Sequence, residues 1–380
     1  MKILTIDDQH LILLSLEKKL TELGYQVLTA DNGKLGKECF DYYKPDLVIV
    51  DINMPDMSGL EVVKHIRIKS KSKTPILVMS GNTDEKIIVD GFDLGIDDYM
   101  KKPVSLNEVA ARVKRILGSE PTALKIAHKN DTEQMLQQYC VGVVIPCYNE
   151  EDRISSSIFQ DFTHKNLGYH LCFVNDGSTD NTLRVLEELR KGNEDTISIY
   201  NCEKNGGKAE AVRQGVLHLS KDPQLNYIGY LDADLSTDFR DFDDLVQTME
   251  NSDFKIVSGS RISRMGANIT KESARKIISM TINLIIRTIL GMPFKDTQCG
   301  AKIMDKDIAQ LMFNKKFITR WLFDVEIFMR MRKHYGKDKV QSLICEQPLK
   351  RWIHTDGSKL SMKDSMKIIG QLAQIALHYK

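Results

Sequence analysis

The sequence predicts an α/β protein with two successive domains, each built around a largely parallel sheet. Short apolar runs alternate with amphipathic stretches up to residue 117, and a second series of the same kind begins at Tyr139. Alternating strands and helices are typical of doubly wound parallel sheets, in which helices cover both faces. A length of 380 residues is sufficient for two domains of ordinary size.

The first domain is predicted to span residues 1–118 and to contain a five-stranded sheet. Its expected strands are Lys2–Ile6, Gln26–Thr29, Leu47–Val50, Ile76–Met79 and Asp98–Met100. Amphipathic helices are expected between them, for instance over Leu11–Leu23 and Gly59–Lys69. The last helix is expected to end near Leu117 and Gly118.

The second domain is predicted to span residues 139–353, after a linker of residues 119–138. The linker is polar, with Pro121 near its start, and we expect it to become helical toward its end. The expected strands of the domain are Val141–Ile145, His170–Val174, Ile197–Asn201, Tyr227–Leu231 and Ile256–Ser258. Helices such as Thr182–Arg190 and Ala209–Leu219 are expected between them. In residues 354–380 the apolar spacing predicts an amphipathic helix over Ser361–Tyr379.

Composition and charge argue against several classes of protein. A formal net charge of +1 gives no reason to expect nucleic acid as a partner. The seven cysteines include no C-x-x-C pair, so we expect reduced thiols in a cytoplasmic protein without a secretory signal. The longest apolar stretch, Ile277–Leu290, is interrupted by Asn283 and Arg287. Because a spanning helix needs about 20 apolar residues, no segment is expected to cross a bilayer.

Functional side chains follow four of the strands predicted for the first domain. In chain order they are Asp7 and Asp8, Asp51, Ser80 and Lys102. The carboxyl ends of parallel strands meet at one edge of a sheet, so we expect these side chains to lie close together. Clustered carboxylates favour a bound Mg²⁺, and an aspartate beside Mg²⁺ can act as a nucleophile toward a phosphoryl group.

These residues resemble the response-regulator receiver family over Met1 to about Leu117. The matching motifs are Asp7-Asp8, Asp51 with Met54-Pro55-Asp56-Met57-Ser58-Gly59, Ser80-Gly81 and Lys102-Pro103. The alternative, that Asp8 and Asp51 are ordinary turn residues, is disfavoured because five positions match in order.

The resemblance implies a role for each residue of the first domain's motifs. Asp51 accepts the phosphoryl group, and Mg²⁺ is bound by Asp7, Asp8, Asp51 and the backbone carbonyl of Asn53. Ser80 and Lys102 contact the phosphoryl oxygens, Tyr99 is the switch aromatic, and the Lys102–Pro103 bond is cis. The phosphodonor is then a sensor histidine kinase, and a homodimer formed through this domain is consistent with the resemblance.

Polar turns also follow the strands of the second domain, beside the starts of helices. Such turns offer backbone N–H groups and carboxylates to a nucleotide, and Asp176 is able to accept from a base or ribose. The segment Asn205-Gly206-Gly207-Lys208 places a cation near phosphates. Asp232 and Asp234 just past a buried strand are suited to a divalent cation that bridges a diphosphate leaving group. A solvated turn is the competing interpretation of such a D-x-D spacing.

Residues from about Tyr139 to Tyr379 resemble family-two glycosyltransferases, whose nucleotide-sugar-binding fold is called GT-A. They are most similar to polyprenyl-phosphate glycosyltransferases, particularly dolichyl-phosphate glucosyltransferase and its bacterial relatives. The supporting segments are Ile145–Glu150, Asn175–Ser178, Asp232–Asp234, Gly259–Arg261, Asp296–Gly300, Trp321–Glu326 and Asp356–Lys359.

The resemblance also implies roles for residues of the second domain. The nucleotide sugar is bound by Pro146, Tyr148, Glu150 and Asp176, with Lys208 near its phosphates and Asp232 and Asp234 holding Mg²⁺ or Mn²⁺. The donor sugar and reaction centre are surrounded by Arg261, Gln298, Trp321 and Asp324. The expected catalytic residues are Asp234, Arg261, Gln298 and Asp324. The acceptor phosphate is bound by Arg275 and Ser279, one helical turn apart; a surface arginine is the alternative for Arg275.

Two departures from the family pattern concern the metal and the membrane. Leu235-Ser236-Thr237 follows the D-x-D motif, where prenyl mannosyltransferases often have a glutamine that adds a metal ligand. C-terminal spanning helices, which many relatives carry, are not expected here. Basic residues flank the apolar faces of Arg275–Leu290 and Ser361–Tyr379, which predicts contact with a membrane surface. Packing of both helices on the domain core is the alternative.

The predicted function is inverting transfer of a sugar from a UDP- or GDP-sugar to a polyprenyl phosphate such as undecaprenyl phosphate. Phosphorylation of Asp51 is expected to regulate it, and the expected location is the inner face of the cytoplasmic membrane. One alternative is a sugar or polysaccharide acceptor. Another is a signalling module that binds nucleotide sugar without turnover.

Overall fold

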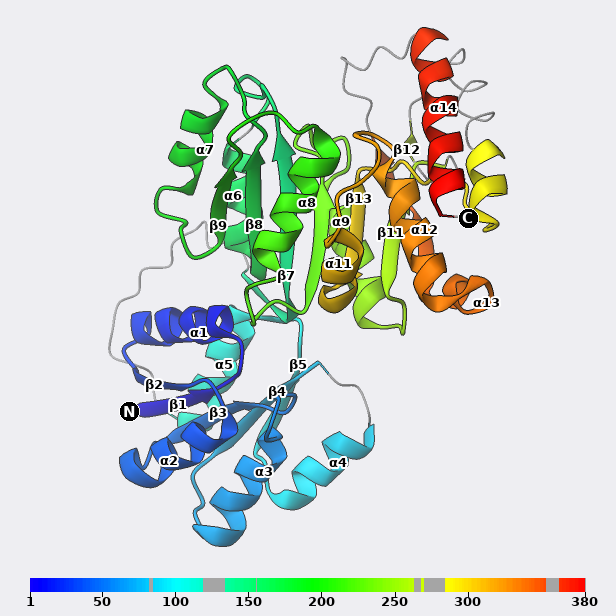
Figure 1. Ribbon diagram of the computed structural model, residues 1–380. Helices are drawn as coiled ribbons and strands as arrows, with labels where there is room; N and C mark the ends of the chain where they lie inside the picture. Colours follow the sequence, from blue (N-terminus) through cyan, green and yellow to red (C-terminus); the bar gives the residue numbers. More distant parts are fainter. Residues whose placement is uncertain are drawn as a thin grey trace. The chain divides into compact units, whose positions relative to one another are not determined.

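The structure is a computed structural model, in which the chain forms two compact units (Figure 1). It describes residues 1–81, 85–118, 134–154, 156–262, 268–269, 284–352 and 362–379. The first unit comprises Met1–Cys140 and Asp161–Tyr169, and the second comprises Val141–Gln160 and His170–Lys380.

The first unit contains the predicted five-stranded parallel sheet, in the order β2-β1-β3-β4-β5. The strands are β1 (Lys2–Ile6), β2 (Gln26–Ala30), β3 (Leu47–Asp51), β4 (Ile76–Ser80) and β5 (Asp98–Lys101). The helices are α1 (His10–Glu22), α2 (Gly33–Tyr43), α3 (Gly59–Lys64) with its π-helical continuation η1 (His65–Lys69), α4 (Glu85–Leu94) and α5 (Leu106–Leu117). The doubly wound fold predicted for this domain is confirmed, with strand bounds that differ by at most one residue.

Apolar side chains pack on both faces of this sheet. Leu16 of α1 and Val113 of α5 belong to the cluster on one face, and Phe40 of α2 and Val63 of α3 belong to the cluster on the other. Side chains also mark the helix starts, since the hydroxyl of Ser105 accepts the N–H groups of two residues in the first turn of α5. These contacts hold the strand ends that carry the predicted functional residues.

The end of the predicted linker is a strand, so the expectation of a helix there was wrong. Strand β7 (Met135–Cys147) begins in the first unit, where Met135 and Leu136 pair with Ser105 and Val104 of β6 (Val104–Ser105). Leu136 is fully buried in the core cluster that contains Val113. The strand places Leu136 in this core while its backbone pairs with β6, and this contact with a partner distant in the sequence decides the local structure.

The second unit is built on a mixed sheet in the order β14-β11-β13-β10-β7-β8-β9. Its further strands are β8 (Asn166–Asn175), β9 (Ile197–Asn201), β10 (Tyr227–Leu231), β11 (Ile256–Ser260), β13 (Ala301–Asp305) and β14 (Ile344–Pro348), with a separate pair of β12 (Asn268–Ile269) and β15 (Arg351–Trp352). β13 runs antiparallel to its neighbours β10 and β11, whereas β10 and β7 are parallel. This mixed α/β architecture agrees with the predicted GT-A class.

Helices accompany each part of this sheet. They are α6 (Ser156–Lys165), α7 (Thr182–Arg190), α8 (Lys208–Leu219), α9 (Phe239–Glu250), residues 284–290, α11 (Lys306–Phe313), α12 (Phe323–Tyr335), α13 (Lys337–Val340) and α14 (Met362–His378), with a 3₁₀ turn η2 (Gln341–Leu343). The predicted amphipathic helix over Ser361–Tyr379 corresponds to α14, in which Leu372 and Ile375 are fully buried and Leu377 is exposed. Of the described helices, none is both long and apolar enough to cross a membrane.

Candidate functional site

Two carboxylates and a lysine meet at one edge of the first unit's sheet. Asp7 follows β1, Asp51 ends β3, and Lys102 follows β5. The Nζ atom of Lys102 lies 2.7 Å from Oδ2 of Asp7 and 3.3 Å from Oδ2 of Asp51. All three side chains are buried, so the ammonium neutralises part of the charge that the carboxylates bring into the interior.

The same edge fits a divalent cation. Carboxylate oxygens of Asp7, Asp8 and Asp51 lie within 4.8 Å of one another. Oδ1 of Asp8 and Oδ1 of Asp51 are buried and have no hydrogen-bond partner in the described part of the chain. A buried oxygen without a partner is costly, and carboxylate oxygens are ligands that Mg²⁺ prefers. The cluster can therefore hold a cation, and Mg²⁺ as its identity remains a prediction.

The pKa values of this cluster have a common cause. Burial raises the pKa of Asp7 to about 6, with Lys102 acting to lower it and Asp51 to raise it. The pKa of Asp8 is also raised, first by burial and then by the charge of Asp51. Burial would lower the pKa of Lys102, but Asp7 and Asp51 outweigh burial and raise it. One lysine leaves excess negative charge among three carboxylates, which favours cation binding.

The remaining residues predicted for this site lie on neighbouring strand ends. The side-chain amide of Asn53 donates to Oγ of Ser80 at 3.2 Å. Tyr99 is half-buried on β5, where burial raises its pKa while a hydrogen bond with Ser80 acts to lower it. The Lys102–Pro103 bond is cis, as the resemblance implied.

In the second unit, acidic residues gather where β10 and β7 end. Asp232 follows β10, and its Oδ1 atom lies 2.5 Å from Nζ of Lys208, the first residue of α8. The carboxylate of Asp234 accepts the N–H of Ser236 at 3.0 Å. Burial raises the pKa of Glu150, and the charges of Asp234 and Asp232 contribute to this shift. These carboxylates are therefore close enough to affect one another's charge. Among the described residues, however, Asp7, Asp8 and Asp51 are the acidic group whose ligand oxygens lie within 4.8 Å of one another, so a cation bound by Asp232 and Asp234 stays a prediction.

Two backbone positions near Asp232, at Gly300 and Leu235, bear on how the acidic residues are placed. A Cβ atom on Gly300 would lie 1.9 Å from Oδ2 of Asp232, so any larger residue there would move the carboxylate out of this position. Leu235, within the turn after the D-x-D motif, has a φ of 51°, which is unfavourable for a residue with a side chain. The turn is thus held in an uncommon conformation beside the acidic residues.

Asp176 organises the turn that carries Lys208. Its two oxygens accept the N–H groups of Gly206 and Gly207, each at 2.8 Å. A cavity of about 600 Å³ lies beside Asp176, and Lys204 and Arg320 also line it. This volume is in the range typical of small-molecule sites. Two other residues predicted to bind the nucleotide, Pro146 and the exposed Tyr148, lie at the end of β7.

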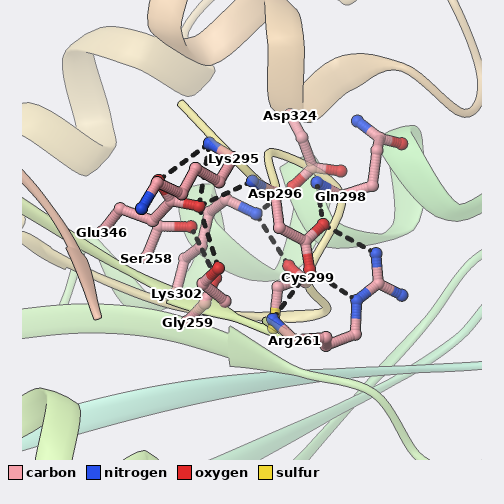
Figure 2. Close-up of polar contacts among 11 residues, drawn as sticks. Ser258, Gly259, Arg261, Lys295, Asp296, Gln298, Cys299, Lys302, Asp324 and Glu346 are labelled. Carbon is pink, nitrogen blue, oxygen red and sulfur yellow. Dashed lines mark hydrogen bonds and ion pairs between the residues drawn. The ribbon is translucent and has the colours of Figure 1, made fainter. Parts of the chain in front are cut away.

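Two carboxylates position Arg261: Asp296 contacts it directly, and Glu346 contacts Asp296. Its Nε and Nη2 atoms donate to the two oxygens of Asp296, each at 2.8 Å (Figure 2). Burial would lower the pKa of Arg261, but Asp296 outweighs burial and raises it. In turn, Glu346 of β14 accepts the N–H of Asp296 at 2.6 Å and that of Lys295 at 2.9 Å. Glu346 therefore orients Asp296, and Asp296 orients Arg261.

Gln298 lies in the same loop as Asp296 and keeps a donor available. Its backbone N–H donates to Oδ1 of Asp296 at 3.3 Å. Its side-chain Nε2 is buried and has no hydrogen-bond partner among the residues that the structure describes. A buried donor of this kind is suited to an oxygen of a bound ligand.

Asp324 is buried at the start of α12 and paired with a lysine. Its Oδ1 atom accepts from Nζ of Lys302 at 2.6 Å and from the hydroxyl of Tyr230. Burial raises the pKa of Tyr230 well above 10, and the charge of Asp324 adds to this shift. Burial would lower the pKa of Lys208, but the charges of Asp232 and then Asp324 outweigh burial and raise it. The Nζ atom of Lys208 lies 5.9 Å from the centre of the Trp321 ring.

The structure thus brings most of the predicted transferase residues toward Lys208 and Asp232, and it adds four that were not assigned a role. These are Tyr230, Asp296, Lys302 and Glu346. Lys302 had a recognisable signal, because it is a charged residue within the apolar run Ala301–Met304. The predicted acceptor residues Arg275 and Ser279, and the motif Asp356–Lys359, lie outside the described residues.

Comparison with known families and proteins agrees with this division of the chain. Residues 3–114 match the family described as "Response regulator receiver domain", and residues 142–316 match "Glycosyl transferase family 2". The "Dolichyl-phosphate beta-glucosyltransferase" of Dictyostelium discoideum is 29% identical over 254 residues, which are 63% of this chain and 74% of that protein. A protein of the same description from Trichomonas vaginalis is 29% identical over 257 residues, 64% of this chain and 75% of its own length.

The first unit has relatives of a different kind. The "Alkaline phosphatase synthesis transcriptional regulatory protein PhoP" of Bacillus subtilis is 41% identical over 142 residues, 37% of this chain. The match spans 58% of that regulator, so only part of the regulator has a counterpart here.

Proposed function

We propose that this chain, in which a response regulator receiver domain precedes a glycosyltransferase domain of family 2, transfers a sugar from a nucleotide sugar to a polyprenyl phosphate. The proposal includes inversion at the sugar carbon, undecaprenyl phosphate as acceptor, and regulation through phosphorylation of Asp51. One observation carries most of it. Lys208 contacts Asp232 at 2.5 Å while also lying within the field of Asp324 and Asp234, so a cation and several carboxylates converge at the start of α8.

The acceptor class is inferred from the relatives and from reaction chemistry. Two relatives, in which the aligned region covers about three quarters of the relative's length, are described as dolichyl-phosphate glucosyltransferases. A phosphate acceptor is already anionic, so its attack on the sugar carbon needs no strong general base. Catalysis then depends on holding the donor and acceptor in line and on stabilising the diphosphate as it leaves.

The charged residues at the centre of the site have distinct roles in this scheme. Asp232 and Asp234 would hold Mg²⁺ or Mn²⁺, which supplies positive charge to the leaving diphosphate. Lys208 adds a second positive charge at the same place, and Asp176 keeps its turn in position. Arg261, whose Nε and Nη2 atoms donate to Asp296, would contribute positive charge near the donor diphosphate or the acceptor phosphate. Asp324, paired with Lys302, is suited to accept hydroxyl groups of the donor sugar.

The receiver domain would supply the regulation. In the proposed phosphorylation, a carboxylate oxygen of Asp51 attacks the phosphorus of a phosphodonor, such as a phosphorylated sensor kinase, and the donor's leaving group departs. Lys102 would then face the new phosphoryl group, since its Nζ atom already lies 3.3 Å from Asp51. Asp7 and Asp8 would share a cation with Asp51.

Association with the inner face of the cytoplasmic membrane is part of the same proposal. A polyprenyl phosphate presents its phosphate at the membrane surface. On α14, Ile369 and Leu377 are exposed, although Leu372 and Ile375 pack against the protein. Two exposed apolar side chains on a helix that also carries the exposed Lys367 are consistent with surface contact.

The direct test is transfer of radiolabelled sugar to undecaprenyl phosphate, run with a panel of UDP- and GDP-sugars and Mg²⁺ or Mn²⁺. We expect one donor to label the lipid, and we expect Asp234→Asn to abolish labelling. Transfer to an oligosaccharide instead of the lipid would replace the proposed acceptor. Nucleotide-sugar binding without transfer to either acceptor would contradict the catalytic proposal.

A further inference from the structure

One wall of the cavity beside Asp176 is the loop between α11 and α12, residues 314–322. Residues 316–320 of this loop line the cavity. The carbonyl of Arg320 accepts the N–H of Ala209 at 3.2 Å, and Trp321 lies near Lys208. The position of the loop therefore decides both the shape of the cavity and its contact with the start of α8.

A buried carboxylate on α12 holds the middle of this loop. Glu326 is fully buried, and its oxygens accept the N–H of Ile318 and the N–H of Thr319, each at 3.0 Å. The hydroxyl of Thr319 donates to the same carboxylate at 3.2 Å. A carboxylate that accepts several N–H and O–H groups gives strong, directional bonds, so these contacts define the backbone of the loop.

An arginine one turn further along α12 holds the beginning of the loop. The guanidinium of Arg330 donates to the carbonyl of Lys315 at 2.9 Å, to that of Lys316 at 2.8 Å and to that of Met312. It also lies 4.2 Å from the centre of the Phe317 ring, and Phe317 lines the cavity. Arg330 therefore contacts three successive residues of the loop, Lys315, Lys316 and Phe317.

The hydroxyl of Tyr379 joins these two anchors. It accepts from Nε of Arg330 at 2.9 Å and donates to Oε2 of Glu326 at 3.3 Å. By comparison, Arg330 and Glu326 contact each other directly only at 3.8 Å. Tyr379 follows α14, which is itself fixed by the buried side chains of Leu372 and Ile375. The hydroxyl of Tyr379 therefore connects the end of the C-terminal helix to the two anchors of the cavity wall.

We propose that Tyr379 is a positioning residue for the donor site, and that docking of α14 is coupled to nucleotide affinity through Arg330, Glu326 and the loop of residues 314–322. The inference rests on the proposed function in one respect, since it takes the cavity beside Asp176 as the place where the donor nucleotide binds. Without the hydroxyl, Nε of Arg330 loses a partner inside the protein, and Arg330 and Glu326 are left with their direct contact at 3.8 Å in place of the bridging hydrogen bonds. The loop is then free to move away from the position shown here, and the shape of the cavity that residues 316–320 line changes with it.

The test compares Tyr379→Phe with the full-length wild-type chain. Phenylalanine keeps the ring and removes only the hydroxyl, so α14 should stay docked. The matched control is Tyr335→Phe, the same change on α12 outside the cluster. A second variant, Arg330→Lys, keeps the positive charge but cannot reach several carbonyls at once.

Two readouts are needed. The first is hydrogen exchange of the loop peptide in ligand-free protein, because the amides of Ile318 and Thr319 bond to Glu326. The second is titration with UDP-glucose and with GDP-mannose in the presence of Mn²⁺, together with donor KM and kcat. For Tyr379→Phe we expect faster exchange and a donor Kd and KM raised by about three- to tenfold, with kcat changed by less than about twofold.

The outcomes separate this inference from the proposed function. Unchanged exchange in the loop peptide would overturn the inference, as would faster exchange with unaltered nucleotide affinity. An equal effect of Tyr335→Phe would also overturn it, because the response would then be a general loss of stability. If the wild type binds neither nucleotide sugar, the proposed donor is contradicted, and the inference falls with it. If the wild type binds nucleotide but transfers no sugar to lipid, only the acceptor proposal fails.

Discussion

Replacing Gly300 by alanine should displace the first acidic residue of the transferase site without removing it. The added Cβ atom would lie 1.9 Å from Oδ2, 2.4 Å from Cγ and 2.8 Å from Oδ1 of Asp232. Ordinary contact between such atoms begins near 3.4 Å, so the carboxylate would have to move by about 1.5 Å. Such a movement breaks the 2.5 Å contact between Asp232 and Lys208.

The size of the effect follows from this displacement. A misplacement of about 1 Å in a catalytic arrangement can lower the rate by roughly a hundredfold, and we expect a loss of about that size in donor-dependent kcat/KM. Overpacking of this kind costs about 1–3 kcal/mol in the free energy of unfolding. The side chain of Asp232 is 28% exposed and has room to rotate, which favours the lower end of that range.

The assay is calorimetric titration of UDP-glucose with Mn²⁺, combined with sugar transfer to undecaprenyl phosphate and a thermal melt. The matched control is Gly370→Ala on α14, because a Cβ atom there meets no heavy atom within 4 Å. Alanine at that helical position should stabilise the protein by about 0.5–1 kcal/mol and leave binding unchanged. Metal-dependent binding and transfer within about threefold of wild type in Gly300→Ala would refute the role given to Asp232.

Four further predictions address individual residues. Acetyl phosphate with Mg²⁺ should label the wild type, and Asp51→Asn should abolish this labelling; persistent labelling would mean another acceptor. Asp234→Ala should remove Mn²⁺- or Mg²⁺-dependent nucleotide binding, and unchanged affinity by calorimetry would contradict its role as a ligand. Arg275→Ala should raise the apparent requirement for undecaprenyl phosphate by about ten- to hundredfold with little change in donor affinity; movement of the donor titration alone would show misassignment. Lys302→Met should lower the unfolding free energy by about 3–5 kcal/mol, because it leaves Asp324 buried without its cation; an unaltered denaturation midpoint would disprove this.

The first domain was predictable in detail because short stretches of its sequence indicate both the strands and the residues at their ends. Apolar residues dominate most of its predicted strands, and Asp7, Asp51 and Ser80 directly follow three of them. In a parallel sheet, all such ends lie on one edge, so order along the chain indicates proximity in space. The ion pairs of Lys102 with Asp7 and Asp51 agree with that expectation.

The second domain was less predictable where its strands are antiparallel or carry charges. β13 and β14 were not expected, since Lys302 interrupts the apolar pattern of the first and Glu346 that of the second. The start of β7 was expected to be helical, because nothing in residues 134–138 indicates their pairing with β6. Pairing partners that lie far away in the sequence decide such segments.

The sequence by itself determined the two fold classes and indicated the residue types proposed to carry the chemistry, because apolar periodicity and short motifs are local properties. Only the tertiary structure decided which charges meet. Arg261 is paired with Asp296 thirty-five positions away, and Tyr379 reaches Arg330 forty-nine positions away. The energy of such contacts depends on separation in space and on burial, which strengthens them by excluding water, and neither quantity can be obtained from spacing along the chain.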